Sequence, residues 1–320
     1  MIDTIKGYLD LEEYSYTDFK DLIKESKITI KGIEQNFNAS FNLSNFKITI
    51  KFTSNKQPIR LYFNGSLSKF YYGNNLAQLD WNTTKVAIKM LSDNLNVDIS
   101  KAKLTRVDFG INMNVNNSVH EYISCLISFP RLDAWKFGND TIKFLSKNGQ
   151  KTLIFYDKIK EIKHSSKETF YSIPYKYRKT NILRYEIQLK KNLKKMFELD
   201  AVYVNSLFDK VIQDIIANIW FDNYYKIIKL SIGIDPKYLL YQYNGVYQYL
   251  SYHGISRLKI ERVMNTISEL NFNVKNPSSK RSKMKSQIKQ LLKNVNKNSI
   301  DKNLIHELDD KIKYVKQLIF

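Results

Sequence analysis

An apolar strand that runs into charged residues is encoded by Thr152-Leu-Ile-Phe-Tyr-Asp-Lys-Ile-Lys-Glu161. The strand places Tyr156 at its end, Lys158 follows two residues later, and Glu161 follows five residues later. A short apolar run that is rich in β-branched and aromatic residues is typical of a strand in the core of a sheet. We therefore expect a tyrosine and a cation at the end of a strand. The carboxylate lies just beyond, where a bend or a helix start would return it toward the tyrosine.

Two further segments show the alternation of half-buried strands: Leu104-Thr-Arg-Val-Asp-Phe-Gly-Ile-Asn112 and Leu183-Arg-Tyr-Glu-Ile-Gln-Leu-Lys190. Each places an acid two residues after an arginine: Arg106 and Asp108 in the first, Arg184 and Glu186 in the second. Side chains two apart in a strand share a face. If both strands belong to one sheet, their acids can converge on a common cation. An ordinary half-exposed sheet with arginine–carboxylate pairs has the same spacing, and the sequence leaves both interpretations open.

The first 190 residues mix strand and helix patterns. Strand-like alternation covers 1–10, 27–31, 46–52, 59–63, 104–112 and 182–190, with a hairpin over about 141–157. Helical spacing covers 16–25, 82–95 and about 118–127, the second capped by Asn82 or Thr83. Asn, Ser and Gly separate the strands, as turns require. The pattern predicts an α+β fold, with a central, largely antiparallel sheet and flanking helices.

The chain beyond residue 190 reads as almost pure helix. We expect helices over 203–230, over 236–270 with a break near His253-Gly254, over 275–297 and over 301–318. The segment 275–297 holds eight basic residues and no acidic one. These patterns divide the chain into an α+β domain, residues 1–200, and a helical, basic region, residues 201–320; we expect the first to be the catalytic domain and the second a DNA-binding or accessory region.

Composition favours a polyanionic partner. Lys and Arg total 51 against 31 acidic residues, which gives a net charge of +20. Such a charge attracts nucleic acid, although lysine-rich usage with only eight arginines is also what an AT-rich genome encodes. The single cysteine, Cys125, excludes an intramolecular disulfide and a thiolate zinc cluster. No run approaches a signal peptide or a membrane span, so we expect a soluble, cytoplasmic protein with no membrane partner.

The charged residues around Tyr156 suit metal-assisted phosphodiester chemistry. A phenolic nucleophile needs a nearby cation or metal ion to overcome its high pKa. Asp108, Glu161 and Glu186 are the candidate metal ligands, with Asp157 and Glu168 as alternatives to Glu161. Carboxylate ligands favour Mg²⁺ or Mn²⁺. The four histidines are scattered and form no His-x-His pair, and no phosphate-binding Gly-x-x-x-x-Gly-Lys-Ser/Thr loop is present.

Two segments are candidate nucleic-acid surfaces. Tyr171-Ser-Ile-Pro-Tyr-Lys-Tyr-Arg178 interleaves rings with cations, which suits base stacking and phosphate binding. Its candidate contacts are Tyr175, Tyr177 and Arg178. The helix over 278–297 offers Lys280, Arg281, Lys283, Lys285 and Lys289 to a duplex backbone. An exposed loop and the solvated face of an amphipathic helix would look the same, and these interpretations stay open.

The order of these segments resembles the gene II replication initiators of filamentous phages and their plasmid relatives. Leu104-Thr-Arg-Val-Asp-Phe109 is similar to the family's strand that ends in an aspartate. Residues 152–161 are similar to its Tyr-x-Lys-x-x-Glu segment, and 183–190, followed by Leu193-Lys-Lys-Met-Phe197, to its Arg-aromatic-Glu strand and basic stretch. Weaker likenesses lie at 61–69 and 247–254. The resemblance covers roughly residues 1–270 and leaves the lysine-rich 275–297 segment unmatched.

The resemblance implies roles for single residues. Tyr156 would be the nicking nucleophile, and Lys158 would lie near the scissile phosphate. Asp108, Glu161 and Glu186 would be metal ligands. Arg106 and Arg184 would orient carboxylates or contact DNA, and Lys190 would contact DNA from the same strand as Glu186.

We therefore expect a rolling-circle replication initiator that nicks and rejoins a double-stranded origin through a 5′-phosphotyrosine. It would act on double-stranded and single-stranded DNA, with host helicase and DNA polymerase as partners, and it could form a homodimer at the origin. A non-enzymatic DNA-binding protein for copy control or partition fits the charge equally well. A metal-independent tyrosine recombinase or topoisomerase is a second alternative.

Overall fold

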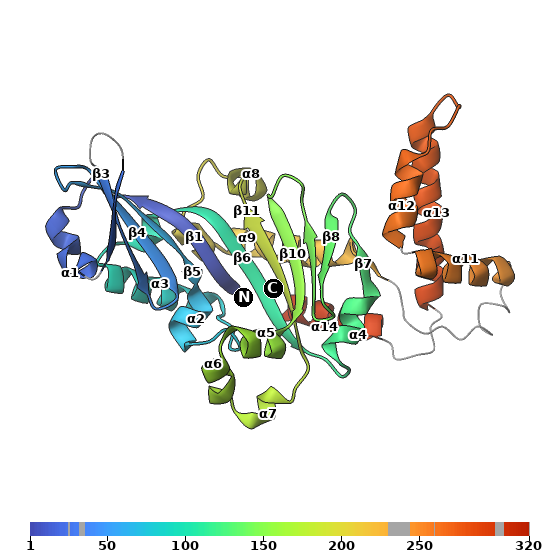
Figure 1. The fold of residues 1–320 in the computed structure, drawn as a ribbon, viewed down its shortest axis with the longest axis horizontal. Coiled ribbons are helices and arrows are strands. Elements are labelled where there is room, and N and C mark those ends of the chain that lie inside the picture. Colours follow the sequence, from blue (N-terminus) through green and yellow to red (C-terminus); the bar gives the residue numbers. More distant parts are fainter. Residues whose placement is uncertain (25, 32–35, 230–243, 259, 298–303, 320) are drawn as a thin grey trace.

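The computed structural model describes residues 1–24, 26–31, 36–229, 244–258, 260–297 and 304–319. Ten strands form its main sheet: β1 (Ile2–Asp10), β2 (Lys27–Lys31), β3 (Asn36–Leu43), β4 (Phe46–Phe52), β5 (Pro58–Ser66), β6 (Lys103–Asn114), β8 (Asp133–Phe137), β9 (Thr141–Leu145), β10 (Lys151–Asp157) and β11 (Ile182–Lys190). Their order is β2-β3-β4-β5-β1-β6-β11-β10-β9-β8, and neighbouring strands pair antiparallel (Figure 1). The α+β class predicted from the sequence is confirmed.

One face of the sheet is apolar and carries the main core. The helices packed with this core are α3 (Trp81–Leu95), α4 (Val119–Cys125), α9 (Lys210–Tyr225) and α14 (Leu304–Ile319). The Phe109 ring lies between Trp81 and Trp220, with ring centroids 6.0 and 5.9 Å apart. Tyr185 stacks on Phe155 at 4.2 Å. Large aromatic rings in contact contribute most to such a core, because each buries much apolar area.

The opposite face of the sheet is polar, and short helices cover one end of it (Figure 1). These are α5 (Lys158–Ser165), α6 (Lys167–Ser172) and α7 (Tyr175–Arg178), which connect β10 to β11. The Asp157 carboxylate caps α5 by accepting a hydrogen bond from the Lys160 amide at 3.0 Å. This cap stops β10 one residue after Tyr156 and turns the chain at once into α5, which contacts β10 and β11.

Shorter elements complete the N-terminal part of the chain. They are η1 (Tyr16–Phe19), α1 (Lys20–Ile23), α2 (Leu67–Tyr72), η2 (Ile99–Lys101), α8 (Leu193–Phe197) and η3 (Val204–Phe208). A second, two-stranded sheet pairs β7 (Leu126–Ser128) with β12 (Ile228–Lys229). The predicted cap of α3 was wrong, because the helix begins one residue earlier and Asp80 accepts from the Thr83 amide at 2.7 Å.

Three helices form an arm beside β7 and the β8 end of the main sheet (Figure 1). They are α11 (Gly245–Leu258), α12 (Ile260–Glu269) and α13 (Pro277–Lys297). Ile255, Ile260 and Leu292 form a small core of their own, against which Ile127 and Ile228 also pack. The predicted break near His253-Gly254 was wrong, since α11 runs through both residues. Residues 236–243 of that predicted helical segment lie outside the described residues.

The segment after residue 200 divides between two cores. Residues in η3, α9 and α14 belong to the same core as the sheet, whereas the arm has a separate small core. The division of the chain into domains at residue 200 stays a prediction. Of the described helices, none is long and apolar enough to cross a membrane.

Candidate active site

The strand register brings most of the predicted site residues onto the polar face of three adjacent strands. On β10, Tyr156 lies opposite Arg184 of β11, and Ile154 lies opposite Glu186. On β6, Asp108 lies opposite Gln188 of β11. Residues directly opposite each other on neighbouring strands point to the same side. The arginines and acids of β6 and β11 therefore share one face, as the alternation predicted. Tyr156 of β10 lies on the same face, which the alternation did not predict.

Arg184 is the hub of this face. Its side chain is only 2% exposed. It donates to Asp3 Oδ2 at 2.6 Å, to Glu186 Oε2 at 3.2 Å and to Asn112 Oδ1 at 3.1 Å. A buried guanidinium is costly unless its donors are satisfied, and here three acceptors from three strands hold it. Arg184 therefore fixes the position of Glu186 and is not free to bind DNA in this arrangement.

Gly110 makes room for this guanidinium. A Cβ atom built at Gly110 would lie 2.8 Å from Arg184 Nη2 and 3.0 Å from Cζ. Glu186 lies directly opposite Gly110 on β11. A side chain at this position would displace Arg184, so glycine is needed here for close approach. The sequence showed this glycine on the polar face of its strand, but not the side chain that it accommodates.

Asp3 belongs to the site, although no sequence pattern singled it out. It is 5% exposed and accepts hydrogen bonds from Arg184 and from the Ser66 hydroxyl. Burial opposes ionisation, but Arg184 and Ser66 together hold the pKa of Asp3 below its ordinary value. The alternation of residues 1–10 indicated a strand with Asp3 in it. Nothing in the sequence pairs that strand with Arg184.

Buried Asp108 and half-buried Arg106 form a second ion pair. Arg106 Nε donates to Asp108 Oδ1 at 2.7 Å, and its Nη2 donates to Oδ2. Asp108 is 1% exposed, and burial raises its pKa to about 7 although Arg106 favours the ionised form. The negative charges of Glu186 and Asp3 add to this rise. Lys190 lies opposite Arg106 on β11, half-buried, and burial and Arg106 lower its pKa.

Lys158 and Glu161 pair at the start of α5. Lys158 Nζ donates to Glu161 Oε2 at 2.6 Å and lies 5.5 Å from the centre of the Tyr156 ring. The lysine side chain is fully buried, and burial together with Arg184 lowers its pKa to about 8. The start of a helix after Asp157 returns Glu161 to this face, as expected. The partner of Glu161 in the structure, however, is Lys158, one helical turn earlier.

Tyr156 lies half-buried beside Glu186, and its hydroxyl donates toward Glu186 Oε2 at 3.5 Å. Burial raises the pKa of Tyr156 well above 10. Arg184 works in the opposite direction, and the charges of Glu186 and Glu161 add to the rise. The phenol is therefore protonated at neutral pH, and it becomes a nucleophile only if a base takes its proton as it attacks.

A pocket of about 480 Å³ opens beside Tyr156. Its walls include Glu161 and Glu186 as well as the tyrosine, together with Asp140, Thr141, Lys143, Ile154, Asp157, Lys160, His164 and Ser165. His164 is a pocket residue that the sequence did not single out, because no second histidine lies near it in the chain. The pocket thus holds a nucleophile, bases and lysines together, which suits a phosphodiester.

The acids of this face fit a divalent cation by their chemistry. Asp3, Asp108 and Glu186 outnumber their two arginine partners, and their mutual repulsion contributes to the raised pKa of Asp108. Mg²⁺ and Mn²⁺ prefer such oxygen ligands. Across the residues that the structure describes, no three His, Cys, Asp or Glu side chains are grouped as a metal site. Each predicted ligand is instead paired with a basic side chain, so the metal site stays a prediction.

The other predicted DNA-binding residues lie apart from this pocket. In α7, Tyr175 is 62% and Tyr177 41% exposed. Arg178 donates to the Ile173 carbonyl at 2.8 Å and lies 5.6 Å from the Tyr171 ring, so it holds the α6–α7 turn together.

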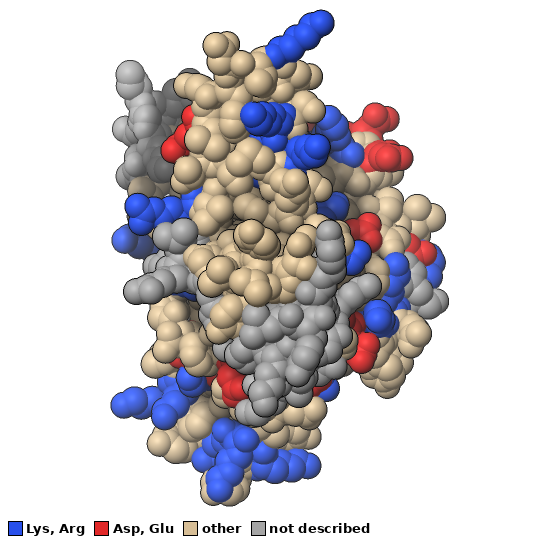
Figure 2. All heavy atoms as spheres, turned by 90° about the vertical axis from the view of Figure 1, so that its right-hand side faces the viewer, with Lys and Arg blue, Asp and Glu red and all other residues tan. Residues whose placement is uncertain are grey.

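The basic residues of α13 divide into two groups. Lys280, Lys283 and Lys289 are exposed, whereas Arg281 and Lys285 hydrogen-bond to the Leu270 carbonyl and the Ser268 hydroxyl near the end of α12. Figure 2 shows the arm side of the molecule, with Lys and Arg side chains projecting at its top and bottom. The exposed lysines are available to a phosphate backbone, and the other two residues join the helices of the arm.

The fold and the site define a chain with a tyrosine, acids and lysines on one open face of an antiparallel sheet. The family model that describes the N-terminal part of the gene II type of replication-associated protein matches residues 1–207. The chain therefore belongs to this family of rolling-circle replication initiators, which act as nicking endonucleases. The resemblance to gene II initiators is confirmed. No curated protein sequence matches the chain.

Proposed function

We propose that this replication initiator nicks DNA by direct attack of Tyr156 on a phosphodiester at the replication origin. The observation that carries the proposal is the position of Tyr156. It lies at the wall of a pocket, with its hydroxyl 3.5 Å from Glu186 and with Lys158 5.5 Å from its ring centre. A phenol that is flanked by a base and by a cation has what nucleophilic catalysis requires.

The step balances as a transesterification. The Tyr156 oxygen forms a bond to phosphorus, the bond from phosphorus to the 3′ oxygen breaks, and the 5′ phosphate stays on the tyrosine. Glu186 receives the phenolic proton, and the departing oxygen takes up a proton from the pocket to become a 3′ hydroxyl. The reverse reaction rejoins the strand, because the phosphotyrosine keeps the bond energy, and joining then requires no ATP.

Buried cations would stabilise the developing charge. Lys158 is held beside the ring by Glu161, and Arg184 holds Glu186 in place. Fixed charges in a partly buried site lower the energy of a charged transition state without reorganising during the reaction. Asp108, Glu161 and Glu186, with Asp3, are the side chains that would hold Mg²⁺ or Mn²⁺. Such an ion supplies charge neutralisation at the phosphate.

The reaction would start on a double-stranded origin and continue on the exposed single strand. The free 3′ hydroxyl is a primer, so a host DNA polymerase and a host helicase are the partners that the chemistry requires. The exposed lysines of α13 suit the duplex backbone. A homodimer at the origin also belongs to the proposal.

The proposal is tested with supercoiled DNA of the protein's own replicon. Wild type, Tyr156→Phe and Tyr314→Phe are incubated with Mn²⁺, with and without EDTA, and protein bound covalently to a nicked 5′ end is measured. Tyr314→Phe is the control, because it makes the same chemical change at a tyrosine that is 60% exposed on α14 and does not line the pocket of Tyr156. An adduct that is lost in Tyr156→Phe and in EDTA, but kept in Tyr314→Phe, supports the proposal. Tight binding without any adduct leaves a DNA-binding protein, and an EDTA-resistant adduct points to a recombinase-like or topoisomerase-like enzyme.

A further inference from the structure

Two exposed aromatic rings stand on β8, the strand at one end of the sheet. Trp135 is 58% and Phe137 51% exposed. Large aromatic side chains are usually mostly buried, and two of them on one short strand form an apolar patch that calls for a ligand. The sequence pattern did not predict β8 and gave these rings no role.

The register places both rings on the face that carries Tyr156. Phe137 lies opposite Thr141 of β9, and Thr141 lies opposite Tyr156 of β10. In the next row, Trp135 lies opposite Lys143, and Lys143 opposite Ile154. Two strand spacings separate the rings from β10, a distance of about 10 Å. The rings thus lie on the same surface as the nucleophile and near it.

Lys143 connects the rings to the pocket. Its Nζ lies 4.8 Å from the centre of the Phe137 ring, and its side chain lines the pocket of Tyr156. A cation beside aromatic rings on an open surface is the pattern that binds a nucleic-acid strand, where bases stack on rings and cations hold phosphates. Lys143 can therefore bind a phosphate that lies between the reacting phosphodiester and the two rings.

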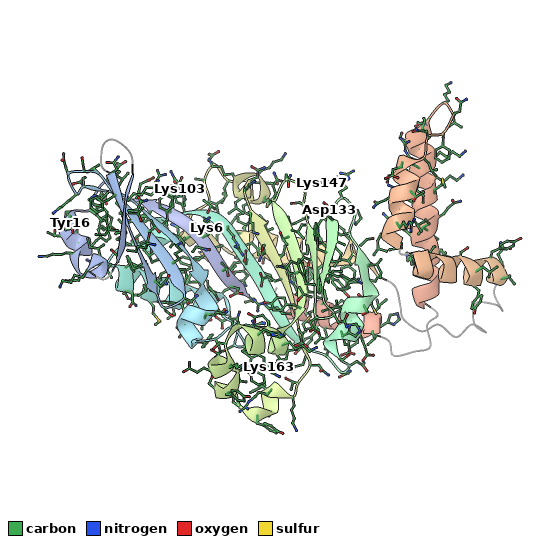
Figure 3. All side chains as sticks on the ribbon, in the orientation of Figure 1. Lys6, Tyr16, Lys103, Asp133, Lys147 and Lys163 are labelled. Atoms are coloured by element: carbon green, nitrogen blue, oxygen red, sulfur yellow. The ribbon has the colours of Figure 1, made fainter. Side chains whose placement is uncertain are left out.

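A basic cleft continues beyond the rings. It has a volume of about 780 Å³ and lies between the β8 edge and the helices α12 and α13. Trp135 lines it, together with Arg131, Lys147, Lys285 and Lys289, and Asp133 is the one acid among its lining residues. Figure 3 shows Lys147 and Asp133 at the end of the β8–β9 edge that lies toward the arm. Trp135 therefore borders this cleft and, through Lys143, adjoins the pocket of Tyr156.

We propose that the single strand next to the nick leaves the Tyr156 pocket over the rings of β8 and enters this basic cleft. The path, which we call the edge track, consists of Lys143, Phe137, Trp135, Lys147 and Lys289. Bases stack on the two rings, and the lysines bind phosphates. This inference rests on the proposed function, since it names the substrate path of the same site.

The charges favour a nucleic-acid strand over a protein partner. The cleft is lined by four basic residues and one acid. A strand of a partner protein that paired with the β8 edge through its backbone would give these basic residues no negative charges, whereas a nucleic-acid strand would. Stacking on rings requires bases that are unpaired, which excludes the interior of a duplex. The occupant is therefore single-stranded, and its sequence is read weakly, because every base has a face to stack.

Binding of a short thymidine oligonucleotide tests the edge track in the Tyr156→Phe background, where no covalent adduct forms. A base that stacks on Trp135 is expected to quench its fluorescence. The change in fluorescence can be assigned to Trp135, because the chain's other two tryptophans, Trp81 and Trp220, pack against Phe109. Trp135→Ala and Phe137→Ala are each expected to weaken binding roughly tenfold. The matched control, Tyr314→Ala, removes an equally exposed ring on α14 and leaves binding unchanged.

A second variant keeps the test decisive if a ring variant folds poorly. Lys143→Gln is expected to lower the slope of log Kd against log salt by about 0.7, the contribution of one phosphate on single strands. Unchanged affinity in both ring variants, with an unchanged slope in Lys143→Gln, overturns the track.

The outcomes also separate this inference from the proposed function. If the wild-type protein forms the covalent adduct while the ring variants bind normally, the track fails and the nicking function stands. If the oligonucleotide quenches Trp135 but the wild type forms no adduct, the nicking function fails and the track stands. If the ring variants lose binding to a protein partner but bind the oligonucleotide normally, the β8 edge is assigned to that partner and the track is overturned.

Discussion

Removal of Arg184 tests the buried charge network directly. The change is Arg184→Met, which keeps an unbranched apolar stem and removes the guanidinium. It leaves Asp3 and Glu186, which are 5% and 6% exposed, without their ion-pair partner. It also leaves Asn112 Oδ1 without the donor that lies 3.1 Å away. We expect a large loss of stability, because uncompensated buried charges are among the most costly features in a protein.

The size of the loss follows from the burial. Breaking a buried pair by removing one partner costs about 3–5 kcal/mol. The matched control is Arg60→Met, since Arg60 pairs with Asp10 at 2.5 Å, but both side chains are more than a third exposed. An exposed ion pair with a cation–π contact to Tyr8 contributes roughly 1 kcal/mol. The expected difference between the two variants is thus at least about 2 kcal/mol.

Urea unfolding followed by circular dichroism measures both free energies. Adding Asp3→Asn to Arg184→Met is expected to restore part of the loss, because one of the two unpaired charges is removed. This coupling appears in a double-mutant cycle. Equal losses in Arg184→Met and Arg60→Met, or a cycle with no coupling between Arg184 and Asp3, would refute the reasoning.

Three further predictions concern single positions and one helix. Gly110→Ala is expected to destabilise the fold by about 1–3 kcal/mol through overpacking, and to reduce nicking because Arg184 moves. Normal stability together with normal nicking would contradict the close contact between Gly110 and the Arg184 guanidinium. Burial, with Lys226 nearby, lowers the pKa of Lys151 from its ordinary 10.5. The unfolded chain therefore holds the Lys151 proton more tightly than the folded chain does. The unfolding free energy of wild type, relative to Lys151→Met, should rise as pH approaches 10.5. A difference that stays flat or falls with pH in urea titrations would contradict the lowered pKa. Replacing exposed Lys280 and Lys283 by Gln should weaken duplex binding and reduce its salt slope by about 0.9 for each phosphate that the protein no longer binds. Adduct formation on single-stranded DNA should be unchanged, because neither lysine belongs to the edge track. An unchanged slope would exclude this part of α13 from the duplex interface.

Strand alternation predicted the centre of the fold well. The polar and apolar faces of 104–112 and 183–190 follow from side-chain period two, and the structure pairs these strands directly as β6 and β11. The edge strand β8 was missed, because five residues with Pro130 close before them give too short a pattern. Its exposed rings also reverse the usual rule that aromatic residues mark a buried face.

The partners within the site were harder to predict. Arg184 and Asp3 are 181 residues apart in sequence, and only the order of strands in the sheet brings them together. Spacing placed Asp108 and Glu186 on one face, but it could not show that each acid is bonded to the arginine two residues before it. Glu161 returned to the face as expected, since Asp157 begins a helix there.

The central claim is that Tyr156 carries the DNA. Trypsin releases this residue within Thr152–Lys158, a peptide whose only tyrosine is Tyr156. The nicked complex is digested with nuclease and trypsin, and the peptide that retains a 5′ nucleotide is sequenced by mass spectrometry. A nucleotide or phosphate on Tyr156 is the predicted result. A covalent nucleotide on any other residue, or a nicked product with no peptide attached, would contradict the account.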